Sequence, residues 1–160
     1  MQNEKKGFEG LACYQHALNL LRAAYQLAKE MPNYERYNLS DQLRRASLST
    51  LLNIAEGYGR YHYLDKIHFF YYARGSLCET LSAFISAHAI EYIDDEQLAW
   101  AKEVEVEAEK SLNGYISFIR RQRQGNREFG NQYIREERSE YRVILDVDQE
   151  SDSESLVPDH

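Results

Sequence analysis

The chain has 160 residues and a formal net charge of −7, with 43% hydrophobic residues, 28% charged residues, eight glycines and two prolines. This composition is typical of a strongly structured, soluble domain and excludes a collagen-like chain or a low-complexity linker. No apolar run reaches the length of about 18 residues that a membrane span needs, and no charged-then-apolar leader is present, so we expect a cytoplasmic protein without a membrane partner.

The negative charge is concentrated near the carboxyl end. Residues 126–160 hold 4 Lys+Arg and 10 Asp+Glu, whereas the rest of the chain is close to neutral. Because charge is mixed there with isolated apolar residues, we expect 126–160 to be an acidic tail that is disordered or ordered by a partner. Residues 1–7 are polar and are expected to form a flexible N-terminus.

Apolar residues between positions 11 and 28 recur at spacings of three and four, which predicts a first helix. Pro32 follows its end, because the residue before a proline avoids the helical region. A second helix comes next, with Ser40 as its expected N-cap and with Gly57 and Gly59 expected to end it as C-cap residues.

The second helix is apolar around most of its circumference. One stripe includes Leu43 and a second includes Leu48, Leu51 and Leu52, so we expect burial on more than one side. Asn53 and Glu56 share one face of this helix and need polar partners, because an unpaired buried carboxylate or amide is costly. We infer that a neighbouring helix or a second subunit supplies them.

The same spacing predicts a third helix over about residues 67–88, with Gly75 as a close packing point in its middle. The acidic residues 94–96 predict the start of a fourth helix, which ends in the arginine-rich run 120–125. Four helices joined by short links predict an all-α fold, an antiparallel up-down-up-down four-helix bundle over residues 8–125.

Two motifs point to a known family. Asn53-Ile54-Ala55-Glu56-Gly57 ends the second helix, and Gly75-Ser76-Leu77 with Glu79 lies in the third. With further matches between residues 8 and 123, they make the chain resemble the four-helix-bundle proteins encoded in intervening sequences of bacterial 23S ribosomal RNA genes. That family is related to the accessory variability determinant proteins of diversity-generating retroelements.

The resemblance implies an antiparallel bundle that assembles into a homo-oligomer, a pentameric barrel, and that has no enzymatic activity. For the retroelement branch it also implies binding to a reverse transcriptase and to nucleic acid. For the ribosomal-insert branch it implies no particular activity. The expected partners are therefore further copies of the chain, RNA or DNA, and a reverse transcriptase.

Antiparallel packing of the second and third helices brings Arg44 or Arg45 level with Glu79, and Glu56 level with Lys66, so we predict two ion pairs. Polar groups of this kind mainly specify register, an interpretation that outweighs a catalytic one. The histidines are scattered without metal-ligand spacing, so no metal site and no cofactor are expected. The residues assigned to bundle register or to a subunit contact are Arg45, Asn53, Glu56, Gly57, Gly75 and Glu79.

One end of the predicted bundle collects cations and aromatic rings, a combination that neutralises phosphates and stacks bases. The opposite end carries the acidic residues 94–96 and would repel phosphate. The alternative interpretation is that the arginines complement a helix dipole and the tyrosines wedge subunits together. The candidate nucleic-acid-binding residues are Arg60, Tyr61, Tyr63, Lys66, Arg120, Arg121 and Arg123.

These observations favour a non-enzymatic, nucleic-acid-binding accessory factor with a reverse transcriptase or a ribonucleoprotein as candidate partner. The alternative is a protein-interaction scaffold that touches no nucleic acid. An enzyme is the least favoured class, because the sequence contains no catalytic motif.

Overall fold

The computed structural model describes residues 7–122, which form four α-helices and two short 3-10 helices and contain no strand. The helices are α1 (Ala12–Glu30), α2 (Leu39–Gly59), α3 (Tyr63–Ala89) and α4 (Asp95–Gln122), and the 3-10 helices are η1 (Phe8–Gly10) and η2 (Asn33–Glu35). The predictions of an all-α chain and of four helices are confirmed. The predictions for residues 1–6, for Arg123 and for the tail 126–160 lie outside the described residues.

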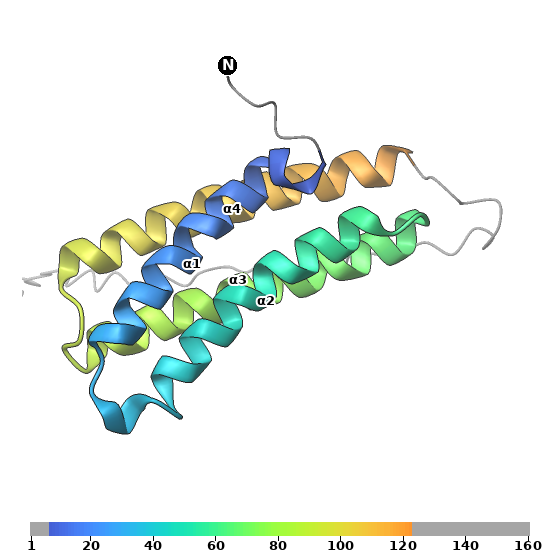
Figure 1. The fold of residues 1–160 in the computed structure, drawn as a ribbon. Coiled ribbons are helices and arrows are strands. Elements are labelled where there is room, and N and C mark those ends of the chain that lie inside the picture. Colours follow the sequence, from blue (N-terminus) through green and yellow to red (C-terminus); the bar gives the residue numbers. More distant parts are fainter. Residues whose placement is uncertain (1–6, 123–160) are drawn as a thin grey trace, which may run out of the picture.

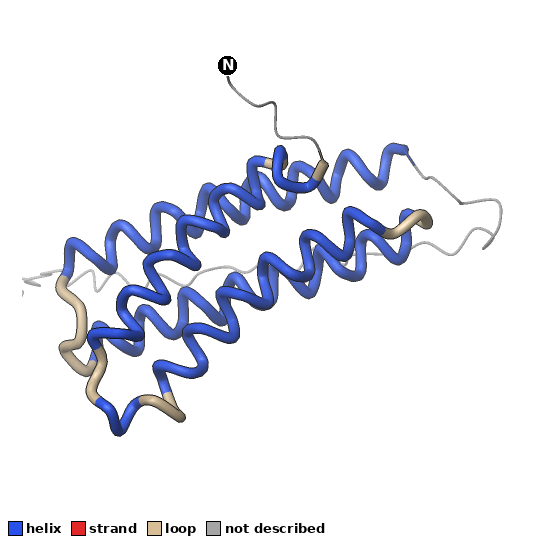
Figure 2. The backbone as a smooth tube through the Cα atoms, viewed as in Figure 1, coloured by secondary structure: helices blue, strands red, loops and turns tan. Residues whose placement is uncertain are grey.

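The four helices lie side by side along their length (Figure 1). Hydrogen bonds between neighbours join Ser49 of α2 to Ser76 of α3 (2.9 Å) and Arg74 of α3 to Asn113 of α4 (3.0 Å). The start of α1, the α2–α3 link and the end of α4 lie at one end of the molecule, which we call the aromatic end. The α1–α2 and α3–α4 connections lie at the other, which we call the acidic end (Figure 2).

The core consists of two apolar clusters. The cluster toward the acidic end includes Leu20, Leu77 and Phe84, and the cluster toward the aromatic end includes Ile54 and Phe70. Because each helix contributes a stripe at spacings of three and four, the clusters follow from the pattern seen in the sequence. No helix among residues 7–122 combines the length and the apolarity needed to cross a membrane.

The surface of α2 differs from the prediction. Leu43 and Ile54 are buried, but Leu48 is 38% exposed and Leu52 is 60% exposed. Within a single chain Leu48 and Leu52 of the second apolar stripe face solvent, whereas Leu51 of the same stripe is buried. The expectation of burial on more than one side is therefore met only in part by the chain's own helices.

The start of α2 is stabilised by a residue that the sequence analysis did not single out. Ser40 lies inside the helix, buried, and its hydroxyl donates to the backbone carbonyl of Ala28 (3.1 Å), so the prediction of Ser40 as N-cap was wrong. Glu35 takes that role, because its Oε2 accepts from the backbone N–H of Leu39 (3.2 Å) and from the side chain of Asn38 (3.1 Å). These bonds satisfy a donor that a helix start leaves free.

The glycines of α2 and α3 also differ from the prediction. The helix continues through Gly57 to Gly59, and Arg60 follows with φ −72°, so neither glycine is a left-handed C-cap. Gly57 instead allows close contact, because a Cβ there would lie 2.9 Å from the ring of Phe70. Gly75 is exposed with nothing within 4 Å of such a Cβ, so it is not a packing point within the chain.

Candidate nucleic-acid interface

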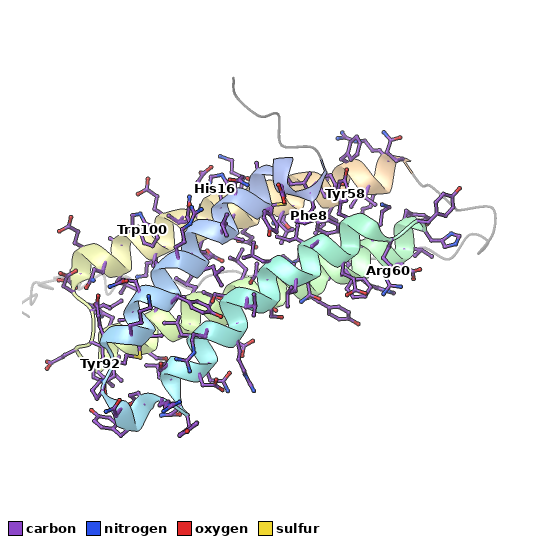
Figure 3. The ribbon with its side chains drawn as sticks, in the orientation of Figure 1. Phe8, His16, Tyr58, Arg60, Tyr92 and Trp100 are labelled. Atoms are coloured by element: carbon purple, nitrogen blue, oxygen red, sulfur yellow. The ribbon has the colours of Figure 1, made fainter. Side chains whose placement is uncertain are left out.

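The predicted binding residues within the described chain gather at the aromatic end. Arg60 directly follows α2, Lys66 lies in the first turns of α3, and Arg120 and Arg121 lie in the last turn of α4. Figure 3 shows the labelled Arg60 at this end, near Tyr58. Neighbouring carboxylates and hydroxyls decide how much of this positive charge remains available to a ligand.

Arg60 is already engaged. Its Nη2 donates to Oε1 of Glu56, one turn earlier, and its guanidinium lies 4.8 Å from the centre of the Phe69 ring. The predicted pair of Glu56 with Lys66 was therefore wrong, because Arg60 is the partner of Glu56. A paired arginine contributes little net charge to an interface.

Arg120 and Arg121 differ in their surroundings. Arg120 is partly buried, and its Nη2 donates to the hydroxyl of Tyr71 (2.5 Å), whose ring also lies 4.9 Å from the guanidinium of Arg74. Arg121 is exposed. Arg121 is thus the better placed of the two to reach a phosphate, whereas Arg120 joins α4 to α3.

The two candidate tyrosines differ in how far their rings are exposed. Tyr61 is 57% exposed and meets His62 edge-on, with 5.0 Å between ring centres. Tyr63 is only 6% exposed and packs in the core cluster of the aromatic end. A buried ring offers no face to a base, so Tyr63 is excluded as a stacking residue and only Tyr61 keeps that role.

An open groove of about 610 Å³ lies between the end of α2, the start of α3 and the end of α4. We call it the aromatic groove. The rings of Tyr115 and Phe118 stack with 5.8 Å between their centres and 23° between their planes, and Phe118 is 45% exposed. The lining residues are Tyr58, Tyr63, Lys66, Tyr115, Phe118, Ile119 and Gln122.

Lys66 supplies the charge of this groove. Its Nζ donates to the backbone carbonyl of Tyr58 (3.0 Å) and lies 5.9 Å from the centre of that ring. Burial lowers the pKa of the Lys66 ammonium below its usual range. Within residues 7–122 no carboxylate forms an ion pair with Lys66, so its charge is available to an anion.

The sequence analysis did not single out Tyr115, Phe118 or Gln122 as binding residues. The spacing of Tyr115 and Phe118 by three residues places them on one face of a helix. This spacing alone does not predict a groove, because the groove also needs Tyr58, which belongs to another helix.

The predicted register contacts form differently. Arg44 and Arg45 lie 3.6 Å and 3.7 Å from Asp41 of their own helix, so the predicted pair of either arginine with Glu79 was wrong. Asn53 donates to the backbone carbonyl of Ser49 (2.9 Å), also in its own helix. The Asn53 amide also donates to the Ser49 hydroxyl (3.1 Å), which is hydrogen-bonded to Ser76 of α3, so Asn53 supports the α2–α3 contact through the Ser49 side chain.

Comparison with family models decides the classification. The model described as "23S rRNA-intervening sequence protein" matches residues 9–114, which is well over half of the chain. The chain belongs to this family. No curated protein sequence matches it.

The match of this 23S rRNA-intervening sequence family member covers η1 without its first residue, all of α1, α2 and α3, and most of α4. It therefore includes Tyr58 and Lys66 but ends one residue before Tyr115. The groove is built partly from the matched region and partly from the last turns of α4. A relation to retroelement proteins stays a prediction.

Among residues 7–122 no group of three or more His, Cys, Asp or Glu side chains could hold a metal ion. Cys13 is buried and Cys78 is exposed, and both are free thiols.

Proposed function

We propose that this 23S rRNA-intervening sequence family protein is a non-enzymatic accessory factor of the cytoplasm that binds single-stranded nucleic acid in the aromatic groove. The observation that carries the proposal is the combination of the stacked Tyr115 and Phe118 rings with the ammonium of Lys66, which forms no ion pair with a carboxylate of residues 7–122, in one open groove. Aromatic faces and a cation beside them are what single-stranded nucleic acid recognition uses.

Three side chains that line the groove have distinct roles in this proposal. The exposed face of Phe118 stacks a base, Lys66 neutralises a phosphate, and Gln122 offers an amide donor and acceptor to a base edge. Arg121 and Tyr61 lie at the same end, exposed, and extend the contact to neighbouring nucleotides. A duplex keeps its bases stacked inside, so the groove favours single strands, loops or ends.

Fluorescence anisotropy with a short labelled RNA or DNA strand tests the proposal. Phe118→Ala should weaken binding by about 5-fold to 150-fold, because stacking contributes about 1 to 3 kcal/mol per base. Tyr37→Ala is the matched control, since Tyr37 is 85% exposed and precedes α2 at the other end of the molecule. Equal affinity of wild type and Phe118→Ala, or no binding that weakens with salt, would reject the proposal.

The proposed assembly is an antiparallel up-down-up-down bundle that forms a homo-oligomer, with five copies as the family resemblance implies. The exposed Leu48 and Leu52, one turn apart on α2, support it because apolar side chains of this size favour burial. Light scattering on the full chain tests it, and Leu52→Glu should shift the mass toward the monomer. A monomeric wild type would contradict it.

The same α2 surface favours the second candidate, a protein-interaction scaffold that binds no nucleic acid. If the protein is such a scaffold, it should form oligomers but should not bind the labelled RNA or DNA strands. A reverse transcriptase is the partner proposed with the first candidate, and co-purification of the two full proteins tests that pairing.

A further inference from the structure

A second groove lies at the acidic end, on the outer surface between the last turns of α1 and the first turns of α4. It has a volume of about 330 Å³ and exposes mainly apolar surface. Leu27, Phe84 and Ile93 form its floor and are buried, whereas Trp100 is 41% exposed at its edge. Figure 3 shows the labelled Trp100 on α4, on the outside of the bundle. We call this the Trp100 groove.

Carboxylates surround the Trp100 groove. Glu30 of α1 and Glu96 of α4 line it directly. A neighbouring hollow that shares Ile93 and Gln97 with it is lined by three more, Glu91, Asp94 and Asp95. No Lys or Arg lines either cavity, and the single histidine there, His88, lies 2.8 Å from Asp95.

Most of these carboxylates lack a cationic partner within the described chain. Asp94 caps α4 by accepting from the backbone N–H of Gln97 (2.8 Å), and Glu30 accepts from the Gln26 amide (2.5 Å). Neither contact brings a positive charge. An apolar groove with an uncompensated negative rim complements a ligand that is apolar in its centre and cationic on both sides.

We propose that the Trp100 groove docks a basic amphipathic helix of a partner protein, with apolar anchors on the groove floor and Lys or Arg beside Glu30 and Glu96. Every described element here is helical, so no sheet edge is present to receive an extended strand, and recognition must use side chains in a groove. The groove follows the seam of two helices, which is where a third helix packs. The volume lies at the lower end of the range of about 300 to 1,000 Å³ typical of ligand pockets.

This docking site is separate from the aromatic groove, which lies at the other end of the helices and has the opposite charge. It concerns a protein partner rather than nucleic acid. The two proposals therefore fail or hold independently.

The chain itself provides the reporter, because Trp100 is its only tryptophan. The probe is a synthetic helical peptide of leucine and lysine, with leucine at the positions i, i+3, i+4 and i+7 that make one face. Titration into the full chain should shift Trp100 emission to shorter wavelength as the half-exposed indole becomes buried. The same peptide with glutamate in place of lysine should give no shift.

The variant Glu30→Gln with Glu96→Gln should weaken binding of the lysine peptide about tenfold and reduce its salt dependence. The matched control is Glu9→Gln with Glu103→Gln, which removes two exposed carboxylates that line neither cavity. Thermal unfolding checks that both variants fold. Absence of a Trp100 shift, equal binding of the glutamate peptide, or equal weakening by the control pair would each overturn the proposal.

Discussion

Gly57 of α2 lies against the ring of Phe70 of α3 so closely that no further carbon atom fits between the α2 backbone and this ring. A Cβ at position 57 would lie 2.9 Å from one carbon of the Phe70 ring and 3.0 Å from the Cβ of Phe69. Phe70 is fully buried and cannot move aside. Gly57 thereby brings α2 and α3 together next to the aromatic groove.

Gly57→Ala is therefore expected to lower the free energy of unfolding by up to about 2 kcal/mol. Overpacking a filled core costs about 1 to 3 kcal/mol, and the gain of about 1 kcal/mol that alanine brings in a helix offsets part of this cost. Gly75→Ala is the control, because its added methyl group meets nothing within 4 Å. It should raise stability by about 0.5 to 1 kcal/mol. Urea unfolding measures both, and changes of the same sign would contradict the packing argument.

The sequence predicted the helices well, because spacing and local signals are properties of neighbouring residues. Pro32 ends the first helix, and Asp94 caps the fourth through a reciprocal bond with Gln97. Gly57 was misread for a physical reason: a glycine near a helix end permits either a left-handed cap or a close contact. Only the distance to another helix separates the two.

The predicted ion pairs failed for a related reason. Residue numbers in two antiparallel helices indicate which residues lie at the same height along the bundle. They do not indicate in which direction around the helix axis each side chain points. Both residues form ion pairs with partners one turn away instead: Arg45 pairs with Asp41, and Glu56 pairs with Arg60. Likewise, the aromatic groove joins Tyr58 to Phe118 across the fold. The spacing of apolar residues within one helix does not predict which residues of two different helices line the same groove.

Glu35 connects three parts of the acidic end, and its loss should be costly. Besides capping α2 at Leu39, its carboxylate accepts from the hydroxyl of Tyr92 (3.3 Å), which lies between α3 and α4. Glu35→Ala should lower the free energy of unfolding by about 1 to 3 kcal/mol, because partly buried donors lose their acceptor and α2 loses its cap. Calorimetry or urea unfolding measures this loss.

Tyr34→Phe is the matched control for Glu35→Ala. The Tyr34 hydroxyl bonds to that of Tyr92 (2.7 Å), but Tyr34 is 74% exposed and water replaces the lost partner. Its effect should stay within about 0.5 kcal/mol. A Glu35→Ala protein as stable as Tyr34→Phe would show that the carboxylate does not hold this end together.

The buried thiol of Cys13 should make stability depend on alkaline pH. Burial raises the pKa of Cys13 from 9.0 to about 11. Between these two values the folded state keeps a proton that the unfolded chain loses. The contribution of the protonated Cys13 thiol to the free energy of unfolding is therefore complete below pH 9 and disappears as the pH rises through 11. It amounts to about 2 to 3 kcal/mol. Urea unfolding of wild type and Cys13→Ala should give curves that converge between pH 9 and pH 11, and parallel curves would contradict the assignment.

Thiol labelling gives an independent check of Cys13. Cys78 is exposed, although partial burial raises the pKa of its thiol, so a thiol reagent at pH 8 should modify this one group of the native chain in a phase faster than unfolding. Cys13 should react only after unfolding. In Cys78→Ala the fast reaction should disappear, and a persistent fast phase would mean that Cys13 is accessible.

Arg120 and Arg121 are neighbours in sequence but should behave differently when replaced by alanine. Arg120→Ala removes a bond to the Tyr71 hydroxyl and should cost about 1 to 2 kcal/mol of folding stability. Arg121→Ala should leave the melting temperature unchanged, because Arg121 is exposed. If Arg121 contacts one phosphate of a single strand, its loss reduces the slope of log affinity against log salt by about 0.7.

Measuring melting temperature and oligonucleotide affinity on the same two variants separates folding from binding. Lys102→Ala serves as the control, since Lys102 is an exposed cation of α4 toward the acidic end. It should change neither quantity. An Arg121→Ala protein with an unaltered salt slope would remove Arg121 from the interface and leave the charge contact to Lys66, whereas a lowered melting temperature would show that Arg121, like Arg120, supports the fold.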